Sequence, residues 1–284
     1  MNSLKRKTIE QIRAKKKSGK KITMLTAYDY PLGSLVDQAG IDMVLVGDSL
    51  ANVVLGLDST RDVGMTEMIH HAKAVHRAVK QALLIGDMPF ESYQQNPQRA
   101  VDNAKRFVEV AGCDAVKLEW FDQCLDVAQK IVQAGIPVMG HVGLTPQTAE
   151  KLGGFKVQGK NAASAASIIE SARALQDKGC FSIVLECIPD QISKMITERL
   201  DIVTIGIGAG IHCDGQVLVT HDLLGLFDRY QPKFVKRYAD LNAEILKTLK
   251  CFREDVENQQ FPDSAHSYTI KPEELDNLKT TLPQ

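Results

Sequence analysis

The sequence predicts a single (β/α)₈ barrel, one of the α/β folds, and three observations support this prediction. Short apolar runs rich in Val, Ile and Leu alternate with longer segments that have helical periodicity. Each connection between two runs is long enough to contain a helix, so the strands are expected to be parallel. No linker divides the 284 residues, so we expect one domain over residues 1–284.

The expected elements follow one another as strand, turn and helix. The run 41–46 is almost continuously apolar, which is typical of a strand buried on both faces. Several expected helices end at glycine. An open doubly wound sheet is the alternative, but no glycine-rich first turn dominates. The expected strands are residues 21–27, 41–46, 82–87, 114–119, 136–142, 181–186, 201–207 and 216–219. The expected helices between them are residues 31–40, 67–81, 97–112, 123–134, 162–178 and 190–200.

The two ends of the chain are predicted to be helical additions to the barrel. The basic segment 5–17 contains Glu10 and few serines, so it is expected to be a leading helix, with a targeting segment as the alternative. Residues 232–259 are expected to be helical, and the polar remainder is expected to be irregular.

Composition narrows the class of protein. Apolar residues make up 44% and charged residues 24%, as in ordinary soluble globular proteins. A net charge of −1 gives no reason to expect nucleic-acid binding. No apolar run approaches the roughly 18 residues that span a bilayer. Six cysteines without a Cys-x-x-Cys pair indicate reduced thiols, so we expect a cytoplasmic protein that does not bind membranes.

Four expected strands end in or next to a carboxylate: Asp48, Asp87, Glu119 and Glu186. In a barrel, the carboxyl ends of all strands lie on the face where active sites are built, so these acids would converge. The alternative for each acid is a helix cap or exposure to solvent. Converging carboxylates raise each other's pKa unless a cation is present.

A hard divalent cation suits oxygen ligands without a cluster of His or Cys. Asp48, Asp87 and Glu119 come from neighbouring strands, so we predict that they bind Mg²⁺. Glu186 comes from the far side of the ring and is predicted to be a catalytic base.

Other candidates lie beside these acids. Lys117 and Glu119 point to the same face of a strand, so Lys117 could hold an anionic substrate, unless it reaches solvent. Ser49 could bind a substrate carboxylate or cap a turn, and His141 could touch a ligand or be structural. The glycines at 206–210 could bind phosphate or make a tight turn. The other histidines share no ligand spacing with the acids.

These stretches resemble the ketopantoate hydroxymethyltransferase (3-methyl-2-oxobutanoate hydroxymethyltransferase) family. The resemblance runs in order from about residue 4 to about residue 268 at closely kept spacing. The matching motifs are TAYDY (26–30), VGDSL (46–50), DMPF (87–90), VKLE (116–119), GHVGLTPQ (140–147), GGFKVQG (153–159), VLECIP (184–189), IGIGAG (205–210) and DGQVLV (214–219).

The resemblance implies a (β/α)₈ barrel of the phosphoenolpyruvate/pyruvate type that requires Mg²⁺ and forms a homo-oligomer, typically a decamer. It implies transfer of a hydroxymethyl group from 5,10-methylenetetrahydrofolate to 3-methyl-2-oxobutanoate (α-ketoisovalerate), which gives ketopantoate for pantothenate and coenzyme A synthesis. By the same resemblance Asp48 and Asp87 are metal ligands, and Glu119 completes the site directly or through water. Ser49 and Lys117 would hold the substrate, and Glu186 would accept a proton.

Three positions depart from the family pattern: Ala51 and Trp120 replace glycines, and Ala265 replaces a glutamate. Trp120 is expected to matter most, because a large ring could narrow the mouth of the pocket. A related carbon–carbon lyase or mutase remains an alternative, although no cysteine lies between Cys124 and Cys180 to serve such a lyase. A catalytically inactive barrel with a structural role is the other alternative.

Overall fold

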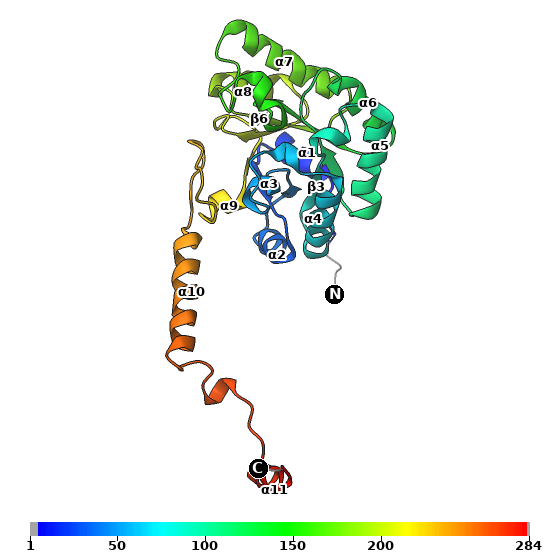
Figure 1. The fold of residues 1–284 in the computed structure, drawn as a ribbon. Helices are drawn as coiled ribbons and strands as arrows, with labels where there is room; N and C mark the ends of the chain where they lie inside the picture. Colours follow the sequence, from blue (N-terminus) through cyan, green and yellow to red (C-terminus); the bar gives the residue numbers. More distant parts are fainter. Residues whose placement is uncertain (1–4, 283–284) are drawn as a thin grey trace.

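The computed structural model describes residues 5–282, and for residues 150–152 it describes only the backbone. The ends of the predicted domain, residues 1–4 and 283–284, therefore lie outside the described part. Eight parallel strands in the described chain close into a barrel in sequence order, which confirms the predicted fold (Figure 1). The strands are β1 (Ile22–Thr26), β2 (Met43–Val46), β3 (Leu83–Asp87), β4 (Ala115–Lys117), β5 (Val138–Gly143), β6 (Ser182–Glu186), β7 (Val203–Ile207) and β8 (Gly215–Leu218).

Helices surround this barrel, and local capping marks where several of them begin. The Asp29 side chain accepts a hydrogen bond from the backbone of Leu32 at the start of α2, and Asn96 caps α5 in the same way, ahead of Pro97. The outer helices are α2 (Tyr30–Gln38), α3 (Leu50–Val53), α4 (Met65–Ala78), α5 (Pro97–Lys105), α6 (Cys124–Gln133), α7 (Ala162–Asp177), α8 (Asp190–Arg199) and α9 (Thr220–Leu223).

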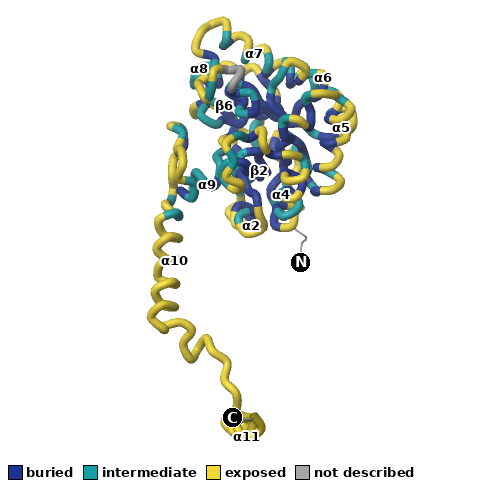
Figure 2. Tube along the Cα trace, viewed as in Figure 1, coloured by how far each residue is buried: buried dark blue, intermediate teal, exposed yellow. Residues whose placement is uncertain are grey.

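The core has two layers, and dark blue in Figure 2 marks where its buried residues lie along the chain. One layer lies between the strands and the surrounding helices, where Phe107 and Leu175 are fully buried. The other fills the inside of the barrel with residues such as Met24, Met43 and Ile85. Burial on both faces explains why the strands are nearly continuous apolar runs.

Helix α1 (Ile9–Lys17) packs against the inner layer of the core through Ile12, which is fully buried. Two of its lysines are paired: Lys15 Nζ lies 2.5 Å from Asp42 Oδ2, and Lys16 Nζ lies 2.8 Å from Asp214 Oδ2. The basic character of this segment therefore serves contacts within the barrel.

The C-terminal region differs from the expectation in two places. The helix expected from residue 232 begins only at Leu241, where Asp240 caps α10 (Leu241–Glu257). The end expected to be irregular contains α11 (Pro272–Thr281), which begins with proline and two glutamates in its first turn. Both helices extend away from the barrel and have no buried residue (Figures 1 and 2).

No helix in residues 5–282 is long and apolar enough to cross a membrane.

Candidate active site

The four predicted acids converge at the carboxyl end of the barrel. Asp87 and Glu186 are the last residues of β3 and β6, whereas Asp48 and Glu119 lie two residues beyond the ends of β2 and β4. All four line one cavity of about 560 Å³. The parallel direction of the strands brings together residues that are up to 138 positions apart.

Lys117 forms a buried ion pair with Asp87. The two residues are register partners on β4 and β3, so their side chains point the same way. Lys117 Nζ lies 2.8 Å from Asp87 Oδ1 and 3.0 Å from Oδ2. Burial lowers the pKa of Lys117, but the surrounding carboxylates outweigh this and raise the pKa well above its usual range. Lys117 is therefore a fixed positive charge in the cavity and does not reach solvent.

Gln147 connects the acids and was not assigned a role from the sequence. Its Nε2 donates to Asp48 Oδ2 at 2.8 Å and to the Met88 carbonyl at 3.2 Å. Its backbone N–H donates to Glu119 Oε2 at 3.0 Å. The residue lies on the loop after β5, so a search for acids at strand ends does not find it. Its place in the GHVGLTPQ motif was the available signal.

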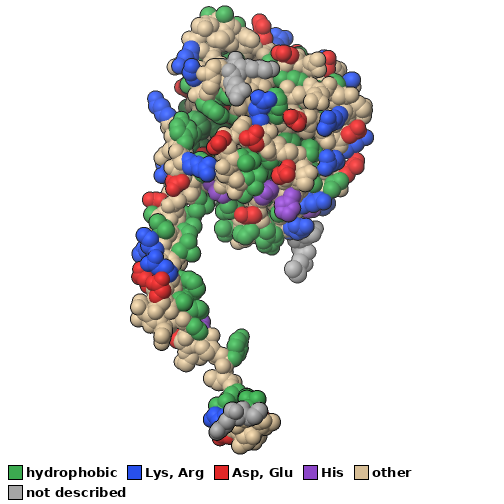
Figure 3. All heavy atoms as spheres, in the orientation of Figure 1, with side chains coloured by type: hydrophobic (Ala, Val, Ile, Leu, Met, Phe, Trp, Pro, Cys, Tyr) green, Lys and Arg blue, Asp and Glu red, His purple; other side chains and the backbone are tan. Residues whose placement is uncertain are grey.

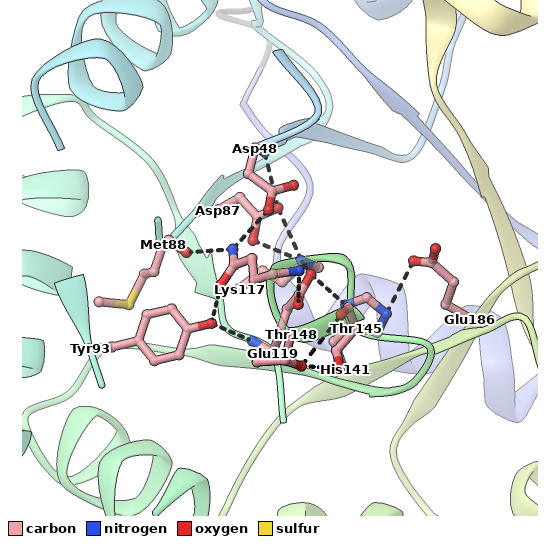
Figure 4. Close-up of polar contacts among 11 residues, drawn as sticks. Asp48, Asp87, Met88, Tyr93, Lys117, Glu119, His141, Thr145, Thr148 and Glu186 are labelled. Carbon is pink, nitrogen blue, oxygen red and sulfur yellow. Dashed lines mark hydrogen bonds and ion pairs between the residues drawn. The ribbon is translucent and has the colours of Figure 1, made fainter. Parts of the chain in front are cut away.

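Tyr93 is a second side chain of this network that the strand pattern does not indicate. Its hydroxyl donates to Gln147 Oε1 and accepts from the Glu119 backbone N–H at 3.4 Å (Figure 4). The residue is fully buried, and burial raises the pKa of its phenol well above the usual value. Tyr93 therefore remains a neutral donor that fixes the orientation of the Gln147 amide.

His141 lies between two carboxylates, as Figure 4 shows. Its Nδ1 is 3.4 Å from Glu119 Oε1 and its Nε2 is 3.2 Å from Glu186 Oε2. Neither ring nitrogen makes an aligned hydrogen bond with any described residue, so these contacts are ion pairs. Burial and Lys117 lower the pKa of His141, but the two carboxylates outweigh them and raise it to about 9. His141 is thus a second cation in the cavity wall.

Ser49 faces the cavity and does not cap a helix. Its hydroxyl lies 2.8 Å from the Tyr28 hydroxyl, and it makes no capping bond to α3. Tyr28 is buried, and burial raises the pKa of its phenol. The pair therefore holds a neutral hydroxyl beside Asp48, where it can donate to an anionic ligand.

The charges of the cluster leave room for a divalent cation. Four carboxylates face only two cations, Lys117 and His141, which leaves two uncompensated negative charges. Burial, followed by repulsion from Glu119, raises the pKa of Asp48, and burial raises the pKa of Asp87 to about 6. An all-oxygen donor set of this charge fits Mg²⁺.

The predicted set of three ligands is not already assembled around one point. In residues 5–282 no three His, Cys, Asp or Glu side chains are placed to hold a metal ion together. Lys117 occupies both Asp87 oxygens, while Gln147 and His141 contact Glu119. Asp48 and Asp87 are adjacent, because the Asp48 N–H donates to Asp87 Oδ2 at 3.2 Å. Of the three predicted ligands, Asp48 and Asp87 are therefore the two that contact each other directly.

Two features that the sequence left open are resolved in the structure. Gly208 and Gly210 have φ of +63° and +76°, and added Cβ atoms would lie 2.8 Å from Phe234 and 1.9 Å from Asp190. The loop is thus a tight turn with close packing, and the Asp190 carboxylate beside it opposes phosphate. Trp120 lines a separate cavity of about 370 Å³ next to α7, so its ring does not narrow the cavity that holds the acids.

The closed barrel and the charged groups at its carboxyl end define a (β/α)₈-barrel enzyme with its active site on that face. Comparison with known proteins then gives the family. A family model described as "Ketopantoate hydroxymethyltransferase" matches residues 6–264. The chain belongs to the ketopantoate hydroxymethyltransferase family, and it is a transferase.

Individual relatives agree with this assignment. The chain is 53% identical to the 3-methyl-2-oxobutanoate hydroxymethyltransferase of Syntrophomonas wolfei over 96% of this chain and 99% of that protein. It is 54% identical to the enzyme of the same name from Moorella thermoacetica over 93% of this chain and 98% of that one.

Solved structures of more distant proteins share the fold. A phosphonopyruvate hydrolase complexed with oxalate and Mg²⁺ superposes with a TM-score of 0.60 at 13% identity, over 96% of this chain and 95% of that one. A 2,3-dimethylmalate lyase, a member of the PEP mutase/isocitrate lyase superfamily, has a TM-score of 0.54 at 13% identity, over 96% and 94% of the two chains. At this identity the likeness concerns the barrel fold alone.

Proposed function

We propose that this enzyme transfers a hydroxymethyl group from 5,10-methylenetetrahydrofolate to 3-methyl-2-oxobutanoate and so forms ketopantoate, in the first step of pantothenate synthesis. Membership of the family carries the choice of reaction. The single structural observation in support is the division of the four acids, in which Asp48, Asp87 and Glu119 gather around Lys117 and Gln147. Glu186 contacts only His141 within this network.

Asp48 and Asp87 would hold Mg²⁺, with Glu119 completing the site directly or through water. When bound there, the ion would draw charge from the substrate keto group and make the C3 proton more acidic. Mg²⁺ usually keeps several of its water ligands and binds proteins through one or two carboxylates. A site with few free protein oxygens is consistent with this preference.

Ser49 and Lys117 would orient the keto acid. The Lys117 ammonium, held at Asp87, offers a positive charge to the substrate carboxylate or keto oxygen. The Ser49 hydroxyl, held by Tyr28, offers a donor from the neighbouring strand end. A substrate held between them has its carboxylate and keto oxygen on the side of the cations, which leaves C3 facing the remainder of the cavity.

Glu186 would act as the general base that removes the C3 proton. Its side chain is about 15% exposed and lines the same cavity, and the His141 imidazolium holds it at 3.2 Å. The electron pair left at C3 then forms the new bond to the methylene carbon of the folate. Water supplies the hydroxyl group of the product, and tetrahydrofolate leaves.

The test is an assay with 3-methyl-2-oxobutanoate, methylenetetrahydrofolate and Mg²⁺, followed by detection of ketopantoate. We expect product only when all three are present. Cleavage of a keto acid without folate would favour the lyase or mutase alternative. Well-folded protein that forms no product in either assay would contradict the proposal.

We further propose that the enzyme is a homo-oligomer, with the decamer as the assembly to test, and that it works in the cytoplasm. An apolar row on α10 supports assembly, because Ile245, Leu249, Phe252 and Val256 recur every three or four residues and are about half exposed. Figure 3 shows hydrophobic side chains gathered along one side of this helix. All six cysteines are free thiols, which supports a reducing compartment.

A further inference from the structure

The cavity that holds the acids has a second, apolar half. In this half the walls include residues of α3, Leu57, Phe155 and the segment that follows α9. The large apolar side chains of this wall are Val53, Leu57, Phe155, Phe227, Tyr230 and Phe234. Phe155 and Tyr230 are 72% and 68% exposed, so their rings lie open beside the cavity.

This wall is continuous with the predicted base. Phe234 packs on the backbone of Gly208, where an added Cβ would lie 2.8 Å from its ring and 3.3 Å from Cys187 Sγ. Cys187 directly follows Glu186 and adopts a φ of 47°, which is uncommon for a residue other than glycine. A ligand that lies along the wall would therefore reach the side of the cavity where Glu186 acts.

Besides the charged cluster, two carboxylates line this cavity: Asp58, which is exposed, and Asp222, which is partly buried. Asp222 on α9 lines the cavity and is partly buried, and no described residue donates a hydrogen bond to its side chain. Burial raises the pKa of Asp222 to about 6, against the opposing charge of Arg237. The position of α9 is fixed, because the Thr220 N–H donates to Thr26 Oγ1 at 3.0 Å and the Thr220 hydroxyl donates to the Thr26 carbonyl.

We propose that the apolar half of the cavity binds the pterin ring of the reduced folate, and that Asp222 accepts hydrogen bonds from its N3–H and 2-amino groups. This inference rests on the proposed use of methylenetetrahydrofolate. The pterin is a flat ring with two adjacent N–H donors on one edge, which match the two oxygens of a carboxylate. Its faces suit the aromatic side chains of the wall.

The size and charge of the cavity agree with this occupant. A cavity of about 560 Å³ is in the range for a drug-sized ligand. The short keto acid would fill only the charged end of this cavity. Arg229 is exposed at the rim and donates to the Gly56 carbonyl at 3.1 Å. In the proposed arrangement its guanidinium would pair with a carboxylate of the glutamate tail at the rim, with the pterin directed inward.

The experiment measures binding of tetrahydrofolate by isothermal titration calorimetry in the full-length enzyme and in Asp222→Asn. Asparagine keeps the shape of the side chain but replaces one acceptor with a donor. We expect the Kd of tetrahydrofolate to rise at least tenfold, because a charge-assisted pair of hydrogen bonds is lost. Exchange of the C3 proton of 3-methyl-2-oxobutanoate in deuterated water, without folate, should stay unchanged.

Asp228→Asn is the matched control, because Asp228 is exposed on the same segment and does not line the cavity. Its Kd should equal that of the unsubstituted enzyme. A second variant, Phe234→Leu, tests the ring contact if Asp222→Asn folds poorly, and we expect its Kd to rise about fivefold. The inference would be overturned if the Kd of Asp222→Asn stayed within twofold of that of the unsubstituted enzyme. The same limit applies to Phe234→Leu when that variant is the one tested.

The same measurements separate this inference from the proposed function. Unsubstituted enzyme that neither binds tetrahydrofolate nor forms ketopantoate would contradict the function itself. Unsubstituted enzyme that forms ketopantoate, together with an Asp222→Asn variant that binds tetrahydrofolate normally, would contradict only the pterin site.

Discussion

Lys117 Nζ lies 2.8 Å and 3.0 Å from the two carboxylate oxygens of Asp87, and both residues are buried. Lys117 compensates the negative charge of Asp87, and both side chains still line the cavity. It therefore holds Asp87 in place and at the same time presents an ammonium group to an anionic substrate.

Lys117→Met should lower the free energy of unfolding by about 3 kcal/mol at pH 8, because it leaves a buried carboxylate without its partner. The pKa of Asp87, already raised by burial to about 6, should rise further in the folded variant. A raised pKa in the folded state means that stability is greatest when the group is protonated. The loss should therefore be small near pH 4 and grow as the pH rises past 6.

Urea unfolding at several pH values measures this effect. Lys194→Met is the control, because Lys194 is exposed and its one ion pair with a residue of the described chain is to Glu198 at 3.9 Å. Its effect should stay within about 0.5 kcal/mol. An equal loss at pH 4 and pH 8 would show that packing, and not the charge of Asp87, causes the change.

Glu186→Gln should stop exchange of the C3 proton of 3-methyl-2-oxobutanoate in deuterated water while leaving Mg²⁺ and keto-acid binding intact. The reason is that Glu186 contacts His141 and none of the proposed metal ligands. Proton NMR of the substrate follows the exchange, and calorimetry follows binding. Normal exchange in this variant would remove Glu186 from the role of base.

Gln147→Leu should destabilise the folded enzyme by about 2–4 kcal/mol. The substitution removes the partners of Asp48, the Met88 carbonyl and the Tyr93 hydroxyl, all of which are buried, and each unsatisfied polar group costs about 1–3 kcal/mol. Urea unfolding gives the change. Gln123→Leu, at an exposed position, is the control. If the free energy of unfolding fell no more than in the control, water would have replaced the hydrogen bonds of the Gln147 amide.

The affinity for Mg²⁺ should depend on pH below neutrality. With a pKa of about 6, Asp87 is ionised at pH 8 and increasingly protonated below pH 6, and a proton competes with the metal for the same oxygens. We expect a nearly constant affinity between pH 7 and pH 8, and a fall of about tenfold per pH unit below pH 6. Titration with Mg²⁺ at four pH values tests this, and an unchanged affinity at pH 5 would exclude Asp87 as a ligand.

Leu249→Glu should reduce the size of the assembly. A glutamate in the apolar row of α10 would be buried without a partner at a contact between subunits. Sedimentation velocity reports the species present. Lys250→Glu changes an exposed position outside the row and serves as the control for altered charge. Assemblies of equal size in both variants would show that α10 does not make the contact.

Much of this architecture could be predicted from the chain alone. The apolar runs and the glycines after the helices indicated the barrel, and the acids at the ends of those runs indicated where the site would form. This was possible because strand burial and chain direction are local properties, and parallel strands necessarily place their carboxyl ends on one face. The sequence therefore predicts that four acids lie close together: Asp48, Asp87, Glu119 and Glu186.

The contacts among these residues were decided by the tertiary structure. Gln147 joins Asp48 although the two are 99 residues apart, and His141 lies between acids from two other strands. Trp120, expected at the mouth of the active-site cavity, lines another cavity. Hydrogen bonds and pKa values depend on distances of a few tenths of an ångström and on the exclusion of water. Those are set only when the barrel closes and its loops pack, and no spacing along the chain encodes them.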